Sequence, residues 1–121
     1  MASIFKNGKI SIEDIKANPK VFSGKTVDEI AEALEDAGYD VTITSSVRPV
    51  SSASIIKINN TGNGKTINQV QVSPGGGRHG ELPYVKISTT DQGKIKIVDG
   101  PERLYKSDGN EKAVIIFSEV D

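Results

Sequence analysis

The chain contains no cysteine and no tryptophan, only one histidine, and few aromatic residues. Without cysteine it forms neither disulfides nor thiolate metal sites. A single histidine cannot supply the three or four ligands that zinc or another transition metal requires. With one histidine, the chain also cannot use a pair of histidines as acid and base. We therefore expect no metal and no other cofactor, and a core filled mainly by isoleucine and valine.

Long apolar runs are also missing. No segment approaches the roughly 20 residues needed to cross a bilayer, and residues 1–14 lack the apolar centre of a signal peptide. We therefore expect no membrane insertion by this domain. A chain of 121 residues fits a single domain, which we divide into a helical part at 11–38 and a sheet part at 40–117.

Two segments near the N-terminus carry helix signals. Residues 11–17, SIEDIKA, start with Ser11 as an N-cap and have acidic residues in the first turn. Residues 26–38, TVDEIAEALEDAG, combine a capping box of Thr26 and Glu29 with apolar residues on one helix face. Gly38 can close this second helix at its C-terminus.

After Gly38 the apolar residues recur at every second position, which is the period of a β-strand. We predict strands at 40–44, 54–59, 67–73, 83–89, 94–98 and 112–117, with TGNGKT at 61–66 as a hairpin turn. Helices followed by a run of strands indicate an α+β fold. We expect N-terminal helices packed on one face of a four- to six-stranded, mainly antiparallel twisted sheet.

The alternation gives this sheet two unlike faces. Pointing towards the helices are Ile56, Ile58, Val85, Ile87, Ile95 and Ile97. If the strands are neighbours, the outward residues include Lys57, Tyr84, Lys86, Ser88, Lys94 and Lys96. Residues 41–98 hold seven basic and two acidic residues, a net charge of +5, while the whole chain carries −1. Such asymmetry indicates a face that binds a polyanion, and a solvated β-surface is the plainer alternative.

One loop gathers the residues that could carry chemistry. In SPGGGRHGELPYVKIST, residues 73–89, Arg78 and His79 follow a glycine run that includes Gly76 and Gly77. Glycines let backbone N–H groups approach a phosphate. An imidazole transfers protons near neutral pH, and a guanidinium binds phosphate through two nitrogens. Together with lysines such as Lys94 that hold the RNA backbone, these groups suit metal-independent RNA cleavage. A plain turn with an exposed histidine is the simpler alternative.

The order of a capped helix ending in AGY, then VTI, then INQVQVSPGGGRHGELPYVKIST and GKIKIVDG resembles small C-terminal toxin domains of bacterial polymorphic and contact-dependent inhibition systems. These belong to the group whose fold is shared by barnase, the EndoU nucleases, colicin-type tRNA nucleases and the RelE toxins. The resemblance covers residues 20–117, and GGGRHG…YVKIST is its most specific part. It implies helices packed against an antiparallel sheet whose open face holds RNA.

The resemblance further implies a ribonuclease that cleaves tRNA in the cytoplasm of a target bacterium. Such a domain would be delivered as the C-terminal part of a secreted or surface effector and neutralised in the producer by an immunity protein. The implied roles are His79 as general acid or base, Arg78 and Lys86 as stabilisers of phosphoryl charge, Ser88 or Thr89 as phosphate-positioning groups, Lys57 and Arg48 as substrate contacts, and Tyr84 as a base-stacking residue. A single histidine departs from the two-histidine pattern, so the acid and base roles stay open.

Three other functions stay open. The first is a non-catalytic RNA-binding module that grips RNA with the same basic face. The second is a small toxin–antitoxin ribonuclease, since GKTVDEIAEALEDAGYDVT is similar to the opening of toxins with a double-stranded-RNA-binding fold, whose histidine follows that helix more closely than His79 does. The third is an immunity or antitoxin protein, for which we expect an acidic face.

Overall fold

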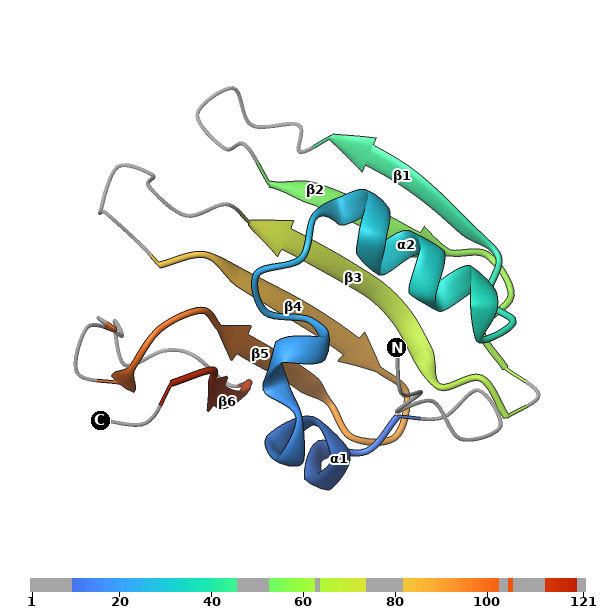
Figure 1. Ribbon diagram of the computed structural model, residues 1–121. Helices are drawn as coiled ribbons and strands as arrows, with labels where there is room; N and C mark the ends of the chain where they lie inside the picture. The colour runs from blue at the N-terminus through green and yellow to red at the C-terminus, as the bar shows by residue number, and fades with distance from the viewer. Residues whose placement is uncertain are drawn as a thin grey trace.

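The computed structural model describes residues 10–45, 53–62, 64–73, 82–102, 105 and 113–119. Its elements follow the chain as helices first and strands afterwards (Figure 1). The helices are α1 (Ile12–Ala17), the 3₁₀ turn η1 (Pro19–Val21) and α2 (Val27–Asp36). The strands are β1 (Val41–Ser45), β2 (Ser54–Ile58), β3 (Ile67–Ser73), β4 (Tyr84–Thr89), β5 (Lys94–Val98) and β6 (Val114–Phe117). The predicted α+β class is confirmed, and each strand falls within about two residues of its predicted bounds.

The six strands form one sheet in chain order, β1-β2-β3-β4-β5-β6. The first five strands pair antiparallel, and β6 pairs parallel to β5. The predicted hairpin turn between β2 and β3 is confirmed, because Gly62 and Lys65 exchange backbone hydrogen bonds of 2.9 and 3.0 Å. The register of β3 against β4 shifts between Ile67 and Gln69, so a β-bulge at Asn68 keeps both Ile67 and Val70 on the buried side.

Side chains predicted as caps fix where both helices begin. The hydroxyl of Ser11 accepts a hydrogen bond from the Asp14 N–H at 3.1 Å and starts α1. Thr26 and Glu29 bond reciprocally at the start of α2, at 3.0 and 3.2 Å, which confirms the capping box. The α2 helix ends at Gly38, whose φ of 98° is costly for any residue with a Cβ.

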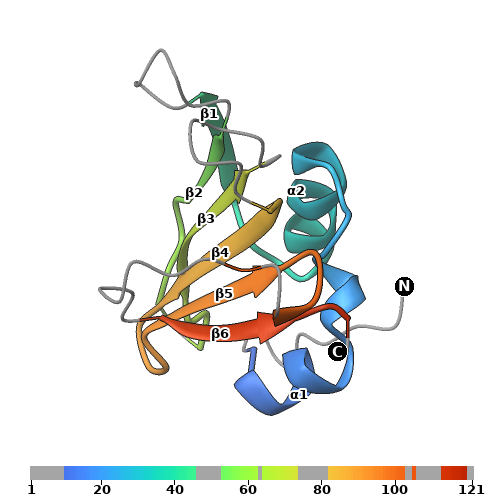
Figure 2. The same cartoon turned by 90° about the vertical axis from the view of Figure 1, so that its left-hand side faces the viewer.

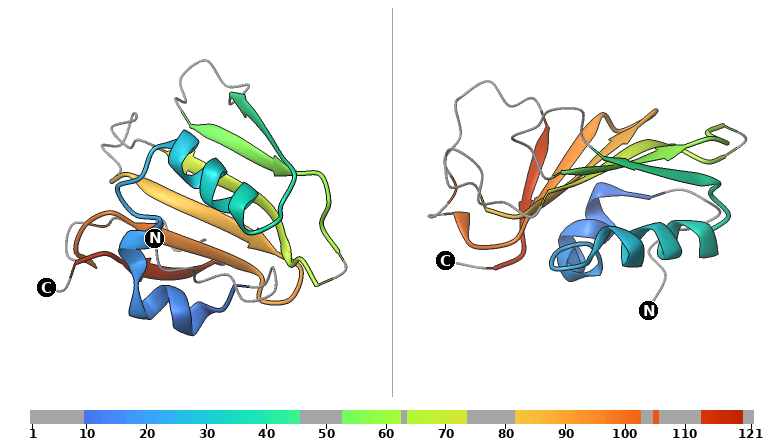
Figure 3. Two further views of the ribbon diagram at one scale, coloured as in Figure 1. Left: turned by 45° about the vertical axis from the view of Figure 1, so that its right-hand side comes forward. Right: turned by 90° about the horizontal axis from the view of Figure 1, so that it is seen from above.

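Both helices lie on the same side of the sheet in Figures 2 and 3. The buried side chains of one sheet face form a single cluster with those of the helices, including Ile15, Ile30 and Leu34. From the strands this cluster includes Ile56, Val70, Val85, Ile87, Ile95, Ile97 and Ile116. The inward direction predicted for these residues is confirmed where the sequence named them, and Ile58, also predicted inward, is half-buried and packs against the same cluster. No helix among the described residues is long and apolar enough to span a membrane.

Candidate functional site

The sheet face opposite the core cluster carries most of the predicted site residues that the structure describes. Along β4, side chains alternate, so Tyr84, Lys86 and Ser88 project away from the buried Val85 and Ile87. The pairing then fixes their neighbours on the adjacent strands. We call this surface the polar face and define it by Lys57, Gln69, Gln71, Tyr84, Lys86, Ser88, Lys94 and Lys96.

The register arranges the polar face as two rows that run across the strands. Lys57 of β2, Gln69 of β3, Ser88 of β4 and Lys94 of β5 stand opposite one another in the first row. In the second row, Gln71, Lys86 and Lys96 do the same. Directly opposed residues have Cβ atoms about 5 Å apart. Each row therefore combines cationic side chains with neutral hydrogen-bonding ones at a spacing that one extended polymer can contact.

The charge of this surface is of one sign. None of the six strands contains an aspartate or glutamate, while β2, β4 and β5 contribute four lysines. Lys86 and Lys96 are direct cross-strand partners, an arrangement that is unfavourable for two like charges in the absence of an anion. Lys57 and Lys94 are exposed, and Lys86 is half-buried. The face therefore presents a positive field that a bound polyanion would neutralise.

Lys96 differs from the other three lysines, because aromatic side chains cover it. Its residue is only 8% exposed. The Lys96 Nζ donates a hydrogen bond to the hydroxyl of Tyr105 at 3.1 Å and lies 4.3 Å from the centroid of the Tyr84 ring. The Tyr105 ring in turn packs edge-on against Phe117 with centroids 5.6 Å apart. Lys96 lies on the predicted outward face, but there its cation is held between two tyrosine rings.

Towards β6 the polar character of this face ends. Val98 is fully buried and stands opposite Phe117, on the same face as Tyr84. The predicted division into one apolar and one basic face therefore holds across β2, β3 and β4 but fails where β5 meets β6. The basic part of this face therefore extends from β2 to β5 and does not reach β6.

Thr89 stands apart from the other predicted phosphate-positioning residue, Ser88. Alternation directs Thr89 to the opposite sheet face, where it pairs with the buried Ile67. Its hydroxyl donates to the Gly93 carbonyl at 2.7 Å and accepts from the Gln92 N–H at 2.9 Å. Both bonds close the turn between β4 and β5. Ser88 is therefore the hydroxyl that the structure brings to Lys86 and Lys94.

Arg48, Gly76, Gly77, Arg78 and His79 lie outside the described residues. The ends of the segment that carries the last four are described. Ser73 closes β3 and is the cross-strand partner of Tyr84 at the start of β4. The Ser73–Tyr84 pair lies at one end of the polar face.

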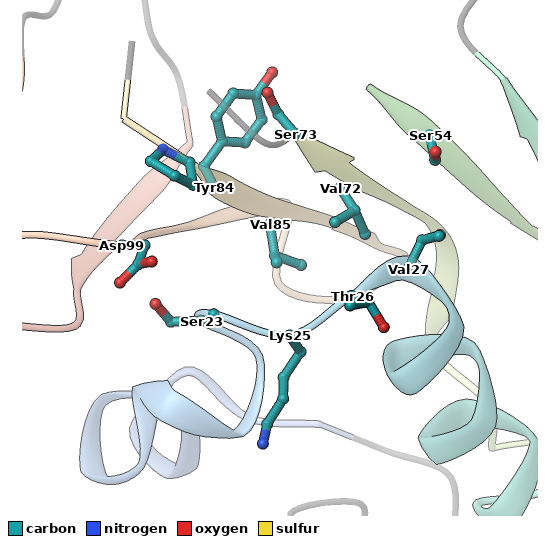
Figure 4. A pocket seen from close by; sticks show the side chains of 12 residues that line it. Ser23, Lys25, Thr26, Val27, Ser54, Val72, Ser73, Tyr84, Val85 and Asp99 are labelled. Carbon is teal, nitrogen blue, oxygen red and sulfur yellow. The ribbon is translucent and has the colours of Figure 1, made fainter. Parts of the chain in front are cut away.

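Three features of this region went unpredicted. Gln71 donates a hydrogen bond to the Tyr84 hydroxyl at 3.2 Å, and the alternation in INQVQVS already placed Gln71 on the outward side. Tyr105 follows the β5 strand in an irregular segment, so no periodic signal announced its contact with Lys96. On the helix side of the sheet, next to the Ser73–Tyr84 pair, lies a cavity of about 410 Å³ that no motif indicated (Figure 4).

Among the described residues, the surroundings displace the pKa of Glu29 and that of Tyr39. A hydrogen bond with the Thr26 backbone lowers the pKa of Glu29 at the start of α2. Burial raises the pKa of Tyr39, which packs in the core. Within the described ranges, no three aspartate, glutamate or histidine side chains come together as metal ligands do.

No protein-family model, curated protein or solved structure matches this chain. The interpretation of its function therefore depends on its own residues and their geometry.

Proposed function

We propose that this chain is a metal-independent endoribonuclease whose RNA substrate lies across the polar face. The observation that carries the proposal is the pairing register, which sets lysines, glutamines and Ser88 in two acid-free rows. Lysine ammonium groups bind phosphates, and the amides and hydroxyl bond to sugars and base edges. Tyr84 adds an aromatic ring on which an unpaired base can stack.

The reaction that fits these groups is internal transesterification of RNA. A base removes the proton from the 2′-OH, whose oxygen then bonds to the adjacent phosphorus to form a 2′,3′-cyclic phosphate. The bond from phosphorus to the 5′ oxygen breaks, and an acid protonates that leaving oxygen. His79 is the only imidazole of the chain and carries out one of these proton transfers. Lys86 and Arg78 stabilise the charge on the phosphoryl oxygens.

The biological setting follows from the resemblance of GGGRHG…YVKIST to bacterial toxin domains. In this proposal tRNA is the substrate, and the domain reaches the cytoplasm of a competing bacterium as the C-terminal part of a secreted or surface effector. An immunity protein protects the producing cell. Since the polar face is positive, we expect the immunity protein to cover it with an acidic surface.

The test is cleavage of purified tRNA by the wild-type chain and by His79→Ala, in buffer that contains EDTA. We expect discrete fragments with cyclic phosphate ends from the wild type and none from His79→Ala. Fluorescence anisotropy should show that the variant binds tRNA within about threefold of the wild type, because one side chain among several phosphate contacts contributes a small share of the affinity. Lys20→Gln, which removes an exposed lysine on η1, serves as a control for general loss of charge.

A wild-type chain that binds tRNA with steep salt dependence but never cuts it would instead be a non-catalytic RNA-binding module. Expression in a sensitive bacterium provides a second test of the toxin assignment. Growth arrest with fragmented tRNA, absent for His79→Ala, supports it. Arrested cells whose RNA stays intact would require another toxic chemistry.

A further inference from the structure

The cavity lies on the helix side of the sheet and shares Tyr84 with the polar face. It has a volume of about 410 Å³, in the range of small-molecule sites. Its walls come from residues 23–27, which connect η1 to α2, and from the ends of β2, β3 and β4 (Figure 4). Asp99, which follows β5, closes one end. The cavity thus collects residues from five separate parts of the chain.

One end of the cavity is polar and incompletely bonded. Ser23 is only 8% exposed, and its hydroxyl has no hydrogen-bond partner among the described residues. Figure 4 shows this hydroxyl and the carboxylate of Asp99 pointing toward one another. A hydroxyl buried without a partner is costly, so its retention favours a ligand that bonds to it.

Asp99 is held in place by its own contacts. Its backbone N–H donates to the Pro83 carbonyl at 2.8 Å, and its Oδ1 accepts a hydrogen bond from the Ser118 hydroxyl at 3.2 Å. The Ser118 hydroxyl itself accepts from the Gly100 N–H at 2.9 Å. These bonds orient the carboxylate before any ligand arrives, which lowers the entropic cost of binding.

Three valines form an apolar part of the cavity. Val72 and Val85 extend from the sheet towards the 23–27 segment, and Val27 faces them from the start of α2 (Figure 4). Lys25 also lines the cavity, but in Figure 4 its ammonium points away from Ser23 and Asp99. The charge directed into the polar end is therefore the negative charge of Asp99.

We propose that this cavity binds a planar cation with adjacent N–H donors, namely an amidinium or a guanidinium such as that of an arginine side chain. The carboxylate of Asp99 accepts hydrogen bonds from such a fork, and the Ser23 hydroxyl accepts one more. The flat faces of the group are weakly hydrated and pack against valine side chains. Anions are repelled by Asp99, and a purely apolar ligand leaves Ser23 unbonded. The site does not depend on RNA cleavage.

The test uses benzamidine as the probe, titrated into the ¹⁵N-labelled chain and followed by amide chemical shifts. We expect saturable shifts concentrated at residues 23–27, Val72, Val85 and Asp99. Benzamide has the same shape but no positive charge, and it should bind at least tenfold more weakly. N-acetyl-arginine amide should shift the same amides, which would identify a side chain as a suitable source of the group. Equal binding of benzamidine and benzamide, or shifts outside the cavity only, would overturn the proposal.

Three variants test which side chains bind the probe. Asp99→Asn keeps the size and an acceptor for Ser118 and should weaken benzamidine binding about tenfold or more. Asp91→Asn, in the turn at the opposite end of β4, removes the same charge and should leave affinity unchanged. Ser23→Ala should weaken binding about threefold without unfolding the chain. An Asp99→Asn variant that folds and binds as tightly as the wild type would disprove the site.

Discussion

The salt dependence of RNA binding follows quantitatively from the number of lysines that the polar face exposes. Lys57 and Lys94 are exposed and Lys86 is half-buried, whereas Lys96 is covered by tyrosine rings. For single-stranded nucleic acid, the logarithm of the association constant falls by about 0.7 per contacted phosphate for each tenfold rise in salt. Three contacts give a slope of about −2. Affinity should then fall about twentyfold between 50 and 200 mM salt.

Removing one of these lysines should reduce the slope by about 0.7, so that Lys86→Gln loses only about sevenfold in affinity over the same salt range. Lys94→Gln should behave alike, since Lys94 stands in the neighbouring row. The assay is fluorescence anisotropy of a labelled single-stranded RNA at four salt concentrations. Lys20→Gln, on the helix side, should keep the full slope. If Lys20→Gln and Lys86→Gln change the slope equally, RNA does not bind across the polar face.

Three further predictions concern stability. Lys96→Ala should lower the free energy of unfolding by about 2 kcal/mol, because it removes a packed aliphatic stem and two cation–π contacts. In urea unfolding, Lys96→Met should recover about half of that free energy. An unchanged free energy of unfolding in Lys96→Ala would contradict the packing with Tyr105. The folded-state pKa of Glu29 is lowered, so its contribution is present above its ordinary pKa of 4.5 and is lost as the pH falls through the folded value. The difference in urea midpoint between wild type and Glu29→Gln should accordingly shrink from pH 7 to pH 3, and a constant difference would show that the Thr26 bond is not responsible. Gly38→Ala should cost about 1 kcal/mol in thermal unfolding, because φ is 98° and a Cβ there meets only ordinary contacts; an unchanged melting temperature would refute the strained backbone.

The elements of this fold were readable because their signals are local. The capping box of Thr26 and Glu29 and the closing Gly38 lie within a dozen residues, and the strands are bounded by turn residues at short intervals. Period-two alternation also fixed which side chains of β4 point outward. Predicting that Lys86 pairs with Gln71 and Lys96 requires the order of the strands in the sheet. The sequence analysis could only assume that these strands are neighbours.

Contacts between distant segments could not be read in this way. Tyr105 covers Lys96 from outside the strand pattern, and the cavity brings Ser23 to Asp99 across most of the chain. Neither contact leaves a periodic trace, because each depends on how irregular segments pack. Thr89 shows the opposite error. Its hydroxyl suggested phosphate binding, but the adjacent turn uses it instead.

The strand order bears on how quickly the molecule can assemble. Each of β1 to β4 pairs antiparallel with its successor in the chain, so the first five strands can form as a series of hairpins with short loop closures. Only β6 joins in parallel, and it must wait for a longer connection to fold back beside β5. The lysine-bearing surface would therefore be complete before the last strand docks. A chain that is unfolded to cross a membrane would regain this surface early in refolding. In pulsed hydrogen exchange during refolding, the amides of β3 and β4 should become protected before those of β6.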